Sequence, residues 1–203
     1  MTKAVWGAGT RLAGVVGLIL ASVSCGSLTR EGTASSYLIV SLLEGASGVD
    51  PGTFATTVAS DVTTVKDGIS TIFSDPGRVR FGLGLKDPGP STSPSTPTQN
   101  NFITVDRYHV RFIRTDGRDR EGVDVPYAFD GAFTVTVSGD TTAGFTLVRN
   151  QAKQEAPLAA LAINPIVIST IAEVTFYGHD QTGRQVSAVG KIDVSFANFG
   201  DPQ

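Results

Sequence analysis

The two histidines, His109 and His179, are the first candidates for chemistry in this chain of 203 residues. Each falls in a stretch with the alternating pattern of a β-strand, on the side opposite to the apolar residues. A zinc site commonly uses three or four protein ligands drawn from histidine, cysteine and carboxylates. Only one cysteine is available, and Asp106, Asp180 or Glu173 would complete a set only if folding brought them together. We therefore interpret both histidines as ordinary solvent-facing side chains and expect no metal or other cofactor.

An acidic cluster between residues 116 and 124 is the second candidate. Its carboxylates are the oxygen ligands that Ca²⁺ prefers, although their spacing matches no EF-hand loop. Arg118 and Arg120 lie in the same segment and would oppose cation binding. We interpret the segment as a solvated charged turn and keep a calcium-binding loop as the alternative. The four acids are Asp116, Asp119, Glu121 and Asp124.

No sequence motif for catalysis is present. The chain contains no Gly-x-Ser-x-Gly motif and no P-loop. The members of a Ser/His/Asp triad need not be neighbours in sequence, and nothing selects one here. Tyr177 faces outward together with His179 and would suit a sugar-binding surface, but we favour positions at the rim of the core for the tyrosines. These are Tyr37, Tyr108, Tyr127 and Tyr177. We expect no enzymatic activity.

The charge balance is mildly acidic, with a formal net charge of −3. Residues 1–24 carry Lys3 and Arg11 and no acid, so their removal would leave 14 basic and 19 acidic side chains. Binding to nucleic acid depends on basic side chains that neutralise phosphates. We therefore expect no nucleic-acid partner.

The first 24 residues have the pattern of a secretory signal peptide, with a basic start, a short apolar run and small residues before a cleavage site. The run at 12–24 is shorter than the roughly 20 residues needed to span a bilayer. The only cysteine, Cys25, follows it directly, between Ser24 and Gly26. An ordinary cleavage after the small residues, with an incidental thiol beside it, is the alternative to a lipidated cysteine.

The stretch from Ala21 to Gly26 resembles the lipobox of bacterial lipoproteins, in which the cysteine becomes the lipidated first residue. It departs from the family pattern at Ser22, where leucine is preferred, and Leu20 lies two residues further back. The resemblance implies lipidation of Cys25 and a membrane as a partner. At about 0.8 kcal/mol for each buried methylene, several acyl chains anchor a protein stably. Residues 25–35 are small and polar, which is typical of a flexible tether.

The remaining residues, 36–203, are predicted to form one domain. Its strongest signal is a hairpin from Ala172 to Phe199, whose arms alternate apolar and polar residues around the turn 180–183. Val189 is the one apolar exception on its polar face. A continuous apolar run at 37–43 indicates a buried strand. The Pro-, Ser- and Thr-rich segment 87–101 is predicted to be an exposed, mobile loop within the domain.

Further patterns predict short strands and turns between these segments. Thr53–Phe73 is expected to hold one or two strands, with a break at 66–68, and 75–77 is expected to be a turn before a strand at 78–86. The apolar phase of the strand at 102–115 shifts near Asp106, which indicates a β-bulge. Residues 123–129 are predicted as an edge strand because of Pro126. A crossover with a short helix is expected at 151–162.

About eight to ten short strands with one long crossover predict an all-β fold, a Greek-key β-sandwich. The architecture resembles the immunoglobulin-like class and the uncharacterised envelope proteins of that type, although the marker cysteines and tryptophan are missing. Together with the leader, this favours an exported, lipid-anchored cell-envelope protein of structural, adhesion or interaction type, on the periplasmic side or the cell surface. Its partner would be another envelope protein or a glycan. The alternative is a carbohydrate- or calcium-binding sandwich module.

Overall fold

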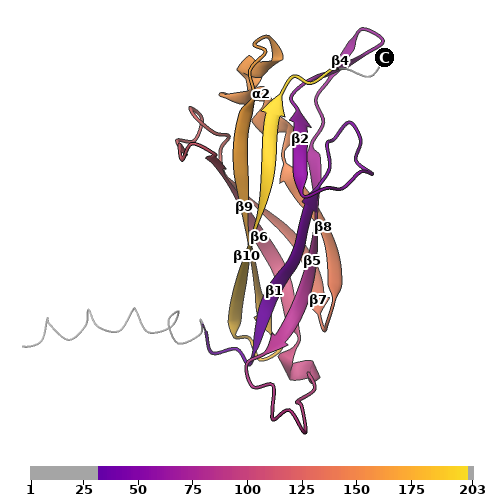
Figure 1. The fold of residues 1–203 in the computed structure, drawn as a ribbon, viewed down its shortest axis with the longest axis vertical. Coiled ribbons are helices and arrows are strands. Elements are labelled where there is room, and N and C mark those ends of the chain that lie inside the picture. The colour runs from indigo at the N-terminus through magenta and orange to yellow at the C-terminus, as the bar shows by residue number, and fades with distance from the viewer. Residues whose placement is uncertain (1–31, 201–203) are drawn as a thin grey trace, which may run out of the picture.

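The computed structural model describes residues 32–200, so the predicted signal peptide and Cys25 lie outside the described residues. Two sheets pack face to face (Figure 1). The smaller sheet has the order β1-β5-β8 and is antiparallel throughout. Its strands are β1 (Ser36–Gly45), β5 (Asp75–Leu85) and β8 (Thr141–Val148).

The larger sheet has five strands in the order β2-β10-β9-β6-β7. Its neighbours are antiparallel except for β2, which runs parallel to β10. The strands are β2 (Thr57–Asp61), β6 (Ile103–Arg114), β7 (Phe129–Val137), β9 (Ile168–Asp180) and β10 (Gln185–Ala197). A small separate hairpin consists of β3 (Thr64–Lys66) and β4 (Ile69–Thr71).

The strand order is that of an immunoglobulin-like sandwich. The chain changes sheets between β1 and β2 and returns at β5 after the β3–β4 hairpin. It changes again between β5 and β6, between β7 and β8, and between β8 and β9. β1, β5 and β8 lie in one sheet, and the last hairpin lies beside β6 in the other, as in sandwiches of this class. The prediction of an all-β sandwich is therefore confirmed.

The final hairpin lies at the centre of the larger sheet. β9 and β10 pair from Gln185 with His179 to Phe196 with Ile168 without a register shift. Buried and partly exposed residues alternate along all of β9, because successive side chains of a strand point to opposite faces. Val189, the apolar exception, is 52% exposed. The predicted hairpin and the faces assigned to it are confirmed.

Aromatic rings join the two sheets in the middle of the sandwich. The ring of Phe81 on β5 meets that of Phe176 on β9 edge to face, with centroids 5.0 Å apart. Phe145 on β8 contacts Tyr108 on β6 at 5.2 Å and Phe176 at 5.5 Å. Edge-to-face pairs of this kind add about 0.5–1.5 kcal/mol beyond the area they bury. This cluster fixes the spacing of the layers.

Three irregular features were correctly predicted. The register of β6 against both of its neighbours shifts between Val105 and Arg107, where the phase change indicated a bulge. The crossover from β8 to β9 contains only short helices, α2 (Asn150–Gln154) and the 3-10 helix η3 (Leu158–Ala162). A further 3-10 helix, η2 (Gln99–Asn101), precedes β6. The break predicted at 66–68 is the turn between β3 and β4.

Residues 75–77 do not form the predicted turn but begin β5. Asp75 is buried and bonded to other segments, and a Cβ at Gly77 would overlap the ring of Phe145 on the neighbouring strand. The Asp-Pro-Gly sequence has the composition of a turn, yet here tertiary contacts hold it extended.

Two other predictions need correction. Residues 123–129 are not an edge strand, since only an isolated bridge joins Glu121 to Val125 and β7 begins at Phe129. β1 covers the predicted segment but is not buried on both faces. Tyr37 is 55% exposed and Ile39 is 45% exposed, because they cover the outer face of β5 at its glycines.

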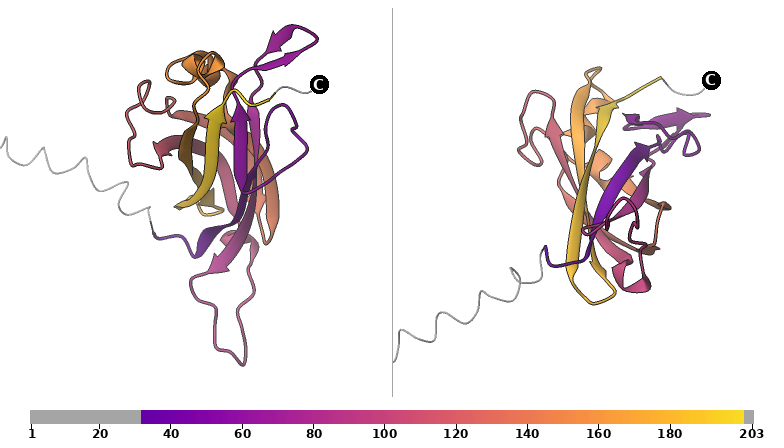
Figure 2. Two further views of the ribbon diagram at one scale, coloured as in Figure 1. Left: turned by 45° about the horizontal axis from the view of Figure 1, so that its top comes forward. Right: turned by 60° about the horizontal axis from the view of Figure 1, so that its bottom comes forward.

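The two ends of the sandwich carry different segments. The chain enters at Gly32 beside the 87–101 loop, whereas α2 and the β3–β4 hairpin lie at the other end (Figures 1 and 2). Most residues of the 87–101 loop are exposed. Among residues 32–200, no helix is both long enough and apolar enough to cross a membrane.

Candidate functional site

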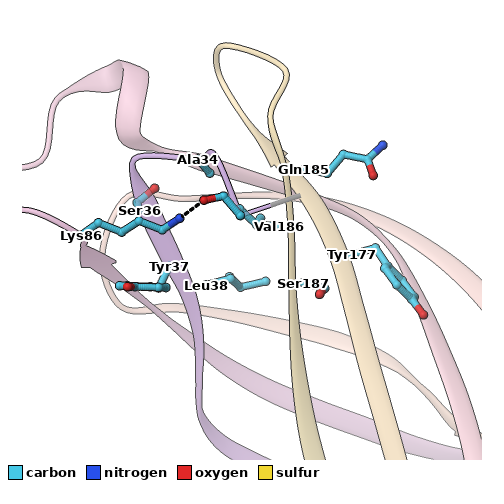
Figure 3. Close-up of a pocket in the computed structure, with 10 residues that line it drawn as sticks. Ala34, Ser36, Tyr37, Leu38, Lys86, Tyr177, Gln185, Val186 and Ser187 are labelled. Atoms are coloured by element: carbon cyan, nitrogen blue, oxygen red, sulfur yellow. Dashed lines mark hydrogen bonds between the residues drawn. The ribbon is translucent and has the colours of Figure 1, made fainter. Parts of the chain in front are cut away.

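A cavity of about 280 Å³ opens at the end of the sandwich where the chain enters (Figure 3). One wall comes from β1 and the residues before it, and the other comes from the β9–β10 hairpin. Lys86, just after β5, lies beside the first wall. The lining residues are Gly32, Ala34, Ser36, Tyr37, Leu38, Lys86, Tyr177, Gln185, Val186 and Ser187.

A second cavity, of about 430 Å³, adjoins the first on the outer side of the hairpin. The two share Tyr177, Gln185 and Val186, and the second adds residues of β6 and of the β9–β10 turn. We call the two together the end groove. The second cavity alone lies in the volume range usual for ligand sites. The residues added by the second cavity are Asp106, Arg107, Gly178, His179 and Gly183.

Hydrogen bonds fix the first wall of the end groove. The Ser36 hydroxyl donates to the Asn101 carbonyl at 2.7 Å, and the Asn101 amide donates to the Ser35 hydroxyl at 2.7 Å. The Lys86 backbone N–H donates to the Ser35 carbonyl at 3.0 Å. These bonds tie the start of β1 to η2 and to the end of β5. The wall is therefore preformed.

The charged side chains of the end groove are arranged over aromatic rings. The Arg107 guanidinium lies 4.5 Å from the ring centroid of Tyr177, and the Lys86 ammonium lies 5.3 Å from that of Tyr37. Lys86 also donates to the Gly32 carbonyl. Neither cation has a carboxylate partner among residues 32–200. Below them, Leu38 is buried and Val186 is half-buried, which gives the groove an apolar floor.

The histidines do not share a site. His109 Nδ1 lies 3.2 Å from Asp130 Oδ1, whereas His179 Nδ1 lies 3.4 Å from Asp106 Oδ2. Both point outward from the larger sheet, as the alternation predicted, and only His179 lines the end groove. No group of three or more histidine, cysteine and acidic residues able to hold a metal occurs within the part of the chain that the structure describes.

Arginines neutralise two of the four carboxylates of the 116–124 loop, Asp116 and Asp124. Asp116 lies 2.7 Å from Arg118 and 3.4 Å from Arg114, and these contacts lower the pKa of Asp116 to about 2, chiefly through the Arg118 side-chain hydrogen bond. The Arg120 guanidinium donates to Asp124 at 2.7 Å and lowers its pKa. A calcium ion would have to displace these arginines. The geometry therefore favours the charged-turn interpretation over the calcium alternative.

The tyrosines are dispersed over the molecule. Tyr108 lies inside the core, and its hydroxyl accepts a hydrogen bond from the Thr146 backbone N–H at 3.2 Å. Tyr127 is exposed and lies against Gly122. Only Tyr37 and Tyr177 meet at one place, the end groove. They do not form a platform, because Arg107 covers one face of the Tyr177 ring.

Sequence reasoning missed a buried polar cluster at the opposite end. The Lys153 ammonium donates to Asp75 Oδ1 at 2.8 Å and to the Asp61 carbonyl at 2.8 Å. The Ser60 hydroxyl and the Gly48 N–H also donate to Asp75. Burial raises the pKa of Asp75, against the opposing effect of Lys153. Nothing in the sequence around these residues signalled their meeting, since they come from four separate segments.

No family model matches this chain, and no curated protein matches its sequence.

Proposed function

We propose that this protein is an exported, lipid-anchored cell-envelope protein that serves as an interaction module and has no catalytic role. The anchor rests on Cys25, the only cysteine, placed directly after the apolar run of the leader. The binding role rests on one observation, the end groove with its apolar floor and two cations that have no carboxylate partner among residues 32–200. Such a mixture of apolar surface and a few polar groups is typical of binding sites.

The position of the groove supports a partner close to the membrane. Only seven residue steps separate Cys25 from Gly32, which lines the groove. A chain of that length reaches about 25 Å at most. An anchored copy would therefore hold the end groove near the membrane surface, facing other envelope components.

The anchor is tested by replacing Cys25 with serine in the full chain and separating membrane and soluble fractions of the producing bacterium. We expect the parent in the membrane fraction and Cys25→Ser outside it, because one lost thioether removes all acyl chains attached there. Ser22→Ala is the matched control, since it keeps the cysteine and a small residue before it. Equal partition of the parent and Cys25→Ser would contradict the lipid anchor.

A further inference from the structure

The side chains of Lys153 and Asp75 bring an amine and a carboxyl group together away from water. Lys153 lies on α2 and Asp75 begins β5, at the end of the sandwich opposite to the end groove (Figure 1). Their side chains are 1% and 0% exposed, and Nζ lies 2.8 Å from Oδ1. Because a carbon–oxygen bond is about 1.2 Å long, Nζ lies within about 4 Å of the carboxyl carbon. The fold therefore holds a nucleophile beside a carbon that it could attack.

Neighbouring groups fix the orientation of both side chains. The Lys153 ammonium also donates to the Asp61 main-chain carbonyl at 2.8 Å, which holds the nitrogen in place. The Ser60 hydroxyl donates to Asp75 Oδ2 at 2.5 Å, and the Gly48 N–H donates to Oδ1 at 2.8 Å. Donors aimed at the oxygens of a reacting carbonyl group stabilise the negative charge that develops there during attack. The site therefore has a positioned amine and a polarised carboxyl group.

Burial favours the uncharged forms that condensation requires. It raises the pKa of Asp75, although Lys153 opposes this effect. In water, hydration stabilises an ammonium and a carboxylate and so opposes their condensation, whereas a buried pair has lost that hydration. Holding the two reactants together adds to this, since well-oriented intramolecular reactions reach effective concentrations of about 10⁵–10⁸ M. The surroundings of this pair therefore favour a neutral amide over two separate charges.

We propose that Lys153 and Asp75 condense into an intramolecular amide bond that links α2 covalently to β5. A proton passes from Nζ to the carboxylate, and the freed lone pair attacks the carboxyl carbon Cγ. The Nζ–Cγ bond forms and one Cγ–oxygen bond breaks. That oxygen leaves as water with two of the three ammonium protons, and the amide keeps the third. No oxidant, reductant or further reactant is consumed.

The amide bond is a modification beyond the proposed function and depends neither on the lipid anchor nor on the end groove. In a molecule that has not yet condensed, the two groups remain the ion pair that the structure shows. The residues are 78 positions apart, so the bond closes a long loop of the chain. Such a link persists in the unfolded protein and restricts its conformations, as a disulfide does.

A second lysine–carboxylate contact provides an internal control. Lys191 Nζ lies 3.1 Å from Glu173 Oε2, nearly as close as in the buried pair. Its side chain is 63% exposed and that of Glu173 is 22% exposed. Water therefore reaches this contact and hydrates its charges. We expect no amide bond between Lys191 and Glu173.

The test is tryptic digestion of the full-length protein, purified from the producing bacterium and then denatured, followed by mass spectrometry. We expect peptides 67–78 and 150–184 to appear mainly as one linked species, lighter than the two together by one water molecule. Trypsin should not cut after Lys153, because the amide removes its charge. Fragmentation of the linked species should place the bond between Lys153 and Asp75. A parent protein that yields mainly separate peptides, cut after Lys153, would overturn the proposal.

Lys153→Arg keeps the positive charge and removes the amine, so the linked species should disappear from its digest. The melting temperature of the purified variant shows whether it folds, and the measurement on the parent protein decides the question if it does not. A folded Lys153→Arg protein that still contains linked peptides 67–78 and 150–184 would overturn the assignment. A linked species that joins Lys191 to Glu173 to the same extent would also overturn it, because contact without burial would then suffice.

Discussion

The ion pair of Lys153 and Asp75 is almost entirely removed from water, with side chains 1% and 0% exposed. Asp75 accepts from Ser60 and Gly48 as well, so both of its oxygens have donors. A buried pair of this kind adds little net stability compared with apolar residues, but removing one partner leaves an uncompensated charge. The pair therefore links α2 to β5 and β2, and removal of either side chain alone is expected to destabilise the fold.

Lys153→Met is expected to lower the free energy of unfolding by about 3–5 kcal/mol, because Asp75 would keep its burial and lose its cation. Urea denaturation followed by circular dichroism measures this. Lys191→Met, which removes an exposed partner of Glu173, is the control and should cost about 0–1 kcal/mol. Similar losses for the two variants would contradict the special position of Lys153.

For single residues, the sequence correctly predicted the orientation of side chains whose position follows from strand alternation. His109, His179 and Val189 face outward as expected. Asp75 and Lys153 escaped prediction because a long-range contact, 78 residues apart, decides their state. Asp-Pro-Gly has the local preferences of a turn, and those preferences are small compared with the cost of an unpaired buried charge.

The bulge in β6 depends on a glycine in the strand beside it. Gly178 lies on β9 opposite Val105, where the register shifts, and a Cβ there would overlap the carbonyl of Thr104. The main chain of β6 has no room to retreat, because β7 pairs with it on the other side. The bulge and the glycine therefore form one unit at the base of the end groove.

Gly178→Ala is expected to destabilise the protein by about 1–3 kcal/mol through this overlap. Gly139→Ala is the matched control, since a Cβ there meets no atom within 4 Å. It should change stability by no more than about 0.5 kcal/mol. Thermal unfolding of the two variants provides the comparison. A Gly178→Ala protein that melts with the parent would show that β6 can move away.

Elements with a clear period were predicted well. The alternation of 172–197 and the phase shift near Asp106 are local patterns, so the hairpin and the bulge were readable from sequence. Residues 123–129 have the apolar content of a strand, but only Val125 finds a partner, with Glu121. Whether a short segment pairs depends on what lies beside it, and that is decided by the rest of the fold.

For the molecule as a whole, several carboxylates bind protons less readily in the folded state. Hydrogen bonds from Arg118 and Arg120 lower the pKa of Asp116 and Asp124, and Lys191 lowers that of Glu173. Burial raises the pKa of Asp180, but hydrogen bonds from Thr182 and Arg184 outweigh it and lower the value overall. A carboxylate whose pKa is lowered in the folded state stabilises the fold at pH values above the ordinary pKa of that group.

Stability is therefore expected to fall as the pH falls from the ordinary carboxyl value of 4.5 for Glu173 to about 2, the value for Asp116. Asp75 acts in the opposite sense, because its raised pKa makes its contribution decrease as the pH rises above 3.8. Urea denaturation across this range measures the sum. Asp180→Asn should reduce the loss of stability as the pH falls. A urea midpoint of the parent protein that stays unchanged down to pH 2 would contradict the stabilising role of these carboxylates.

The class of fold was predictable because many short alternating segments with turns between them have few packed solutions. The end groove was not, since it lies between β1 and β10, two strands at opposite ends of the domain sequence. Tyr37 and Tyr177 were both considered as candidates for a binding surface, but nothing in their spacing showed that they line the same cavity.

The parallel pairing of β2 with β10 also has a mechanical consequence. The chain enters at one end of the long axis, and β10 finishes at the other (Figure 1). A pull between an anchored N-terminus and a load on the C-terminal end draws β10 lengthwise past β2. The bonds between these strands then share the load and yield together, instead of opening one after another. If the N-terminus is anchored as we propose, these bonds are expected to resist tension along the length of the sandwich.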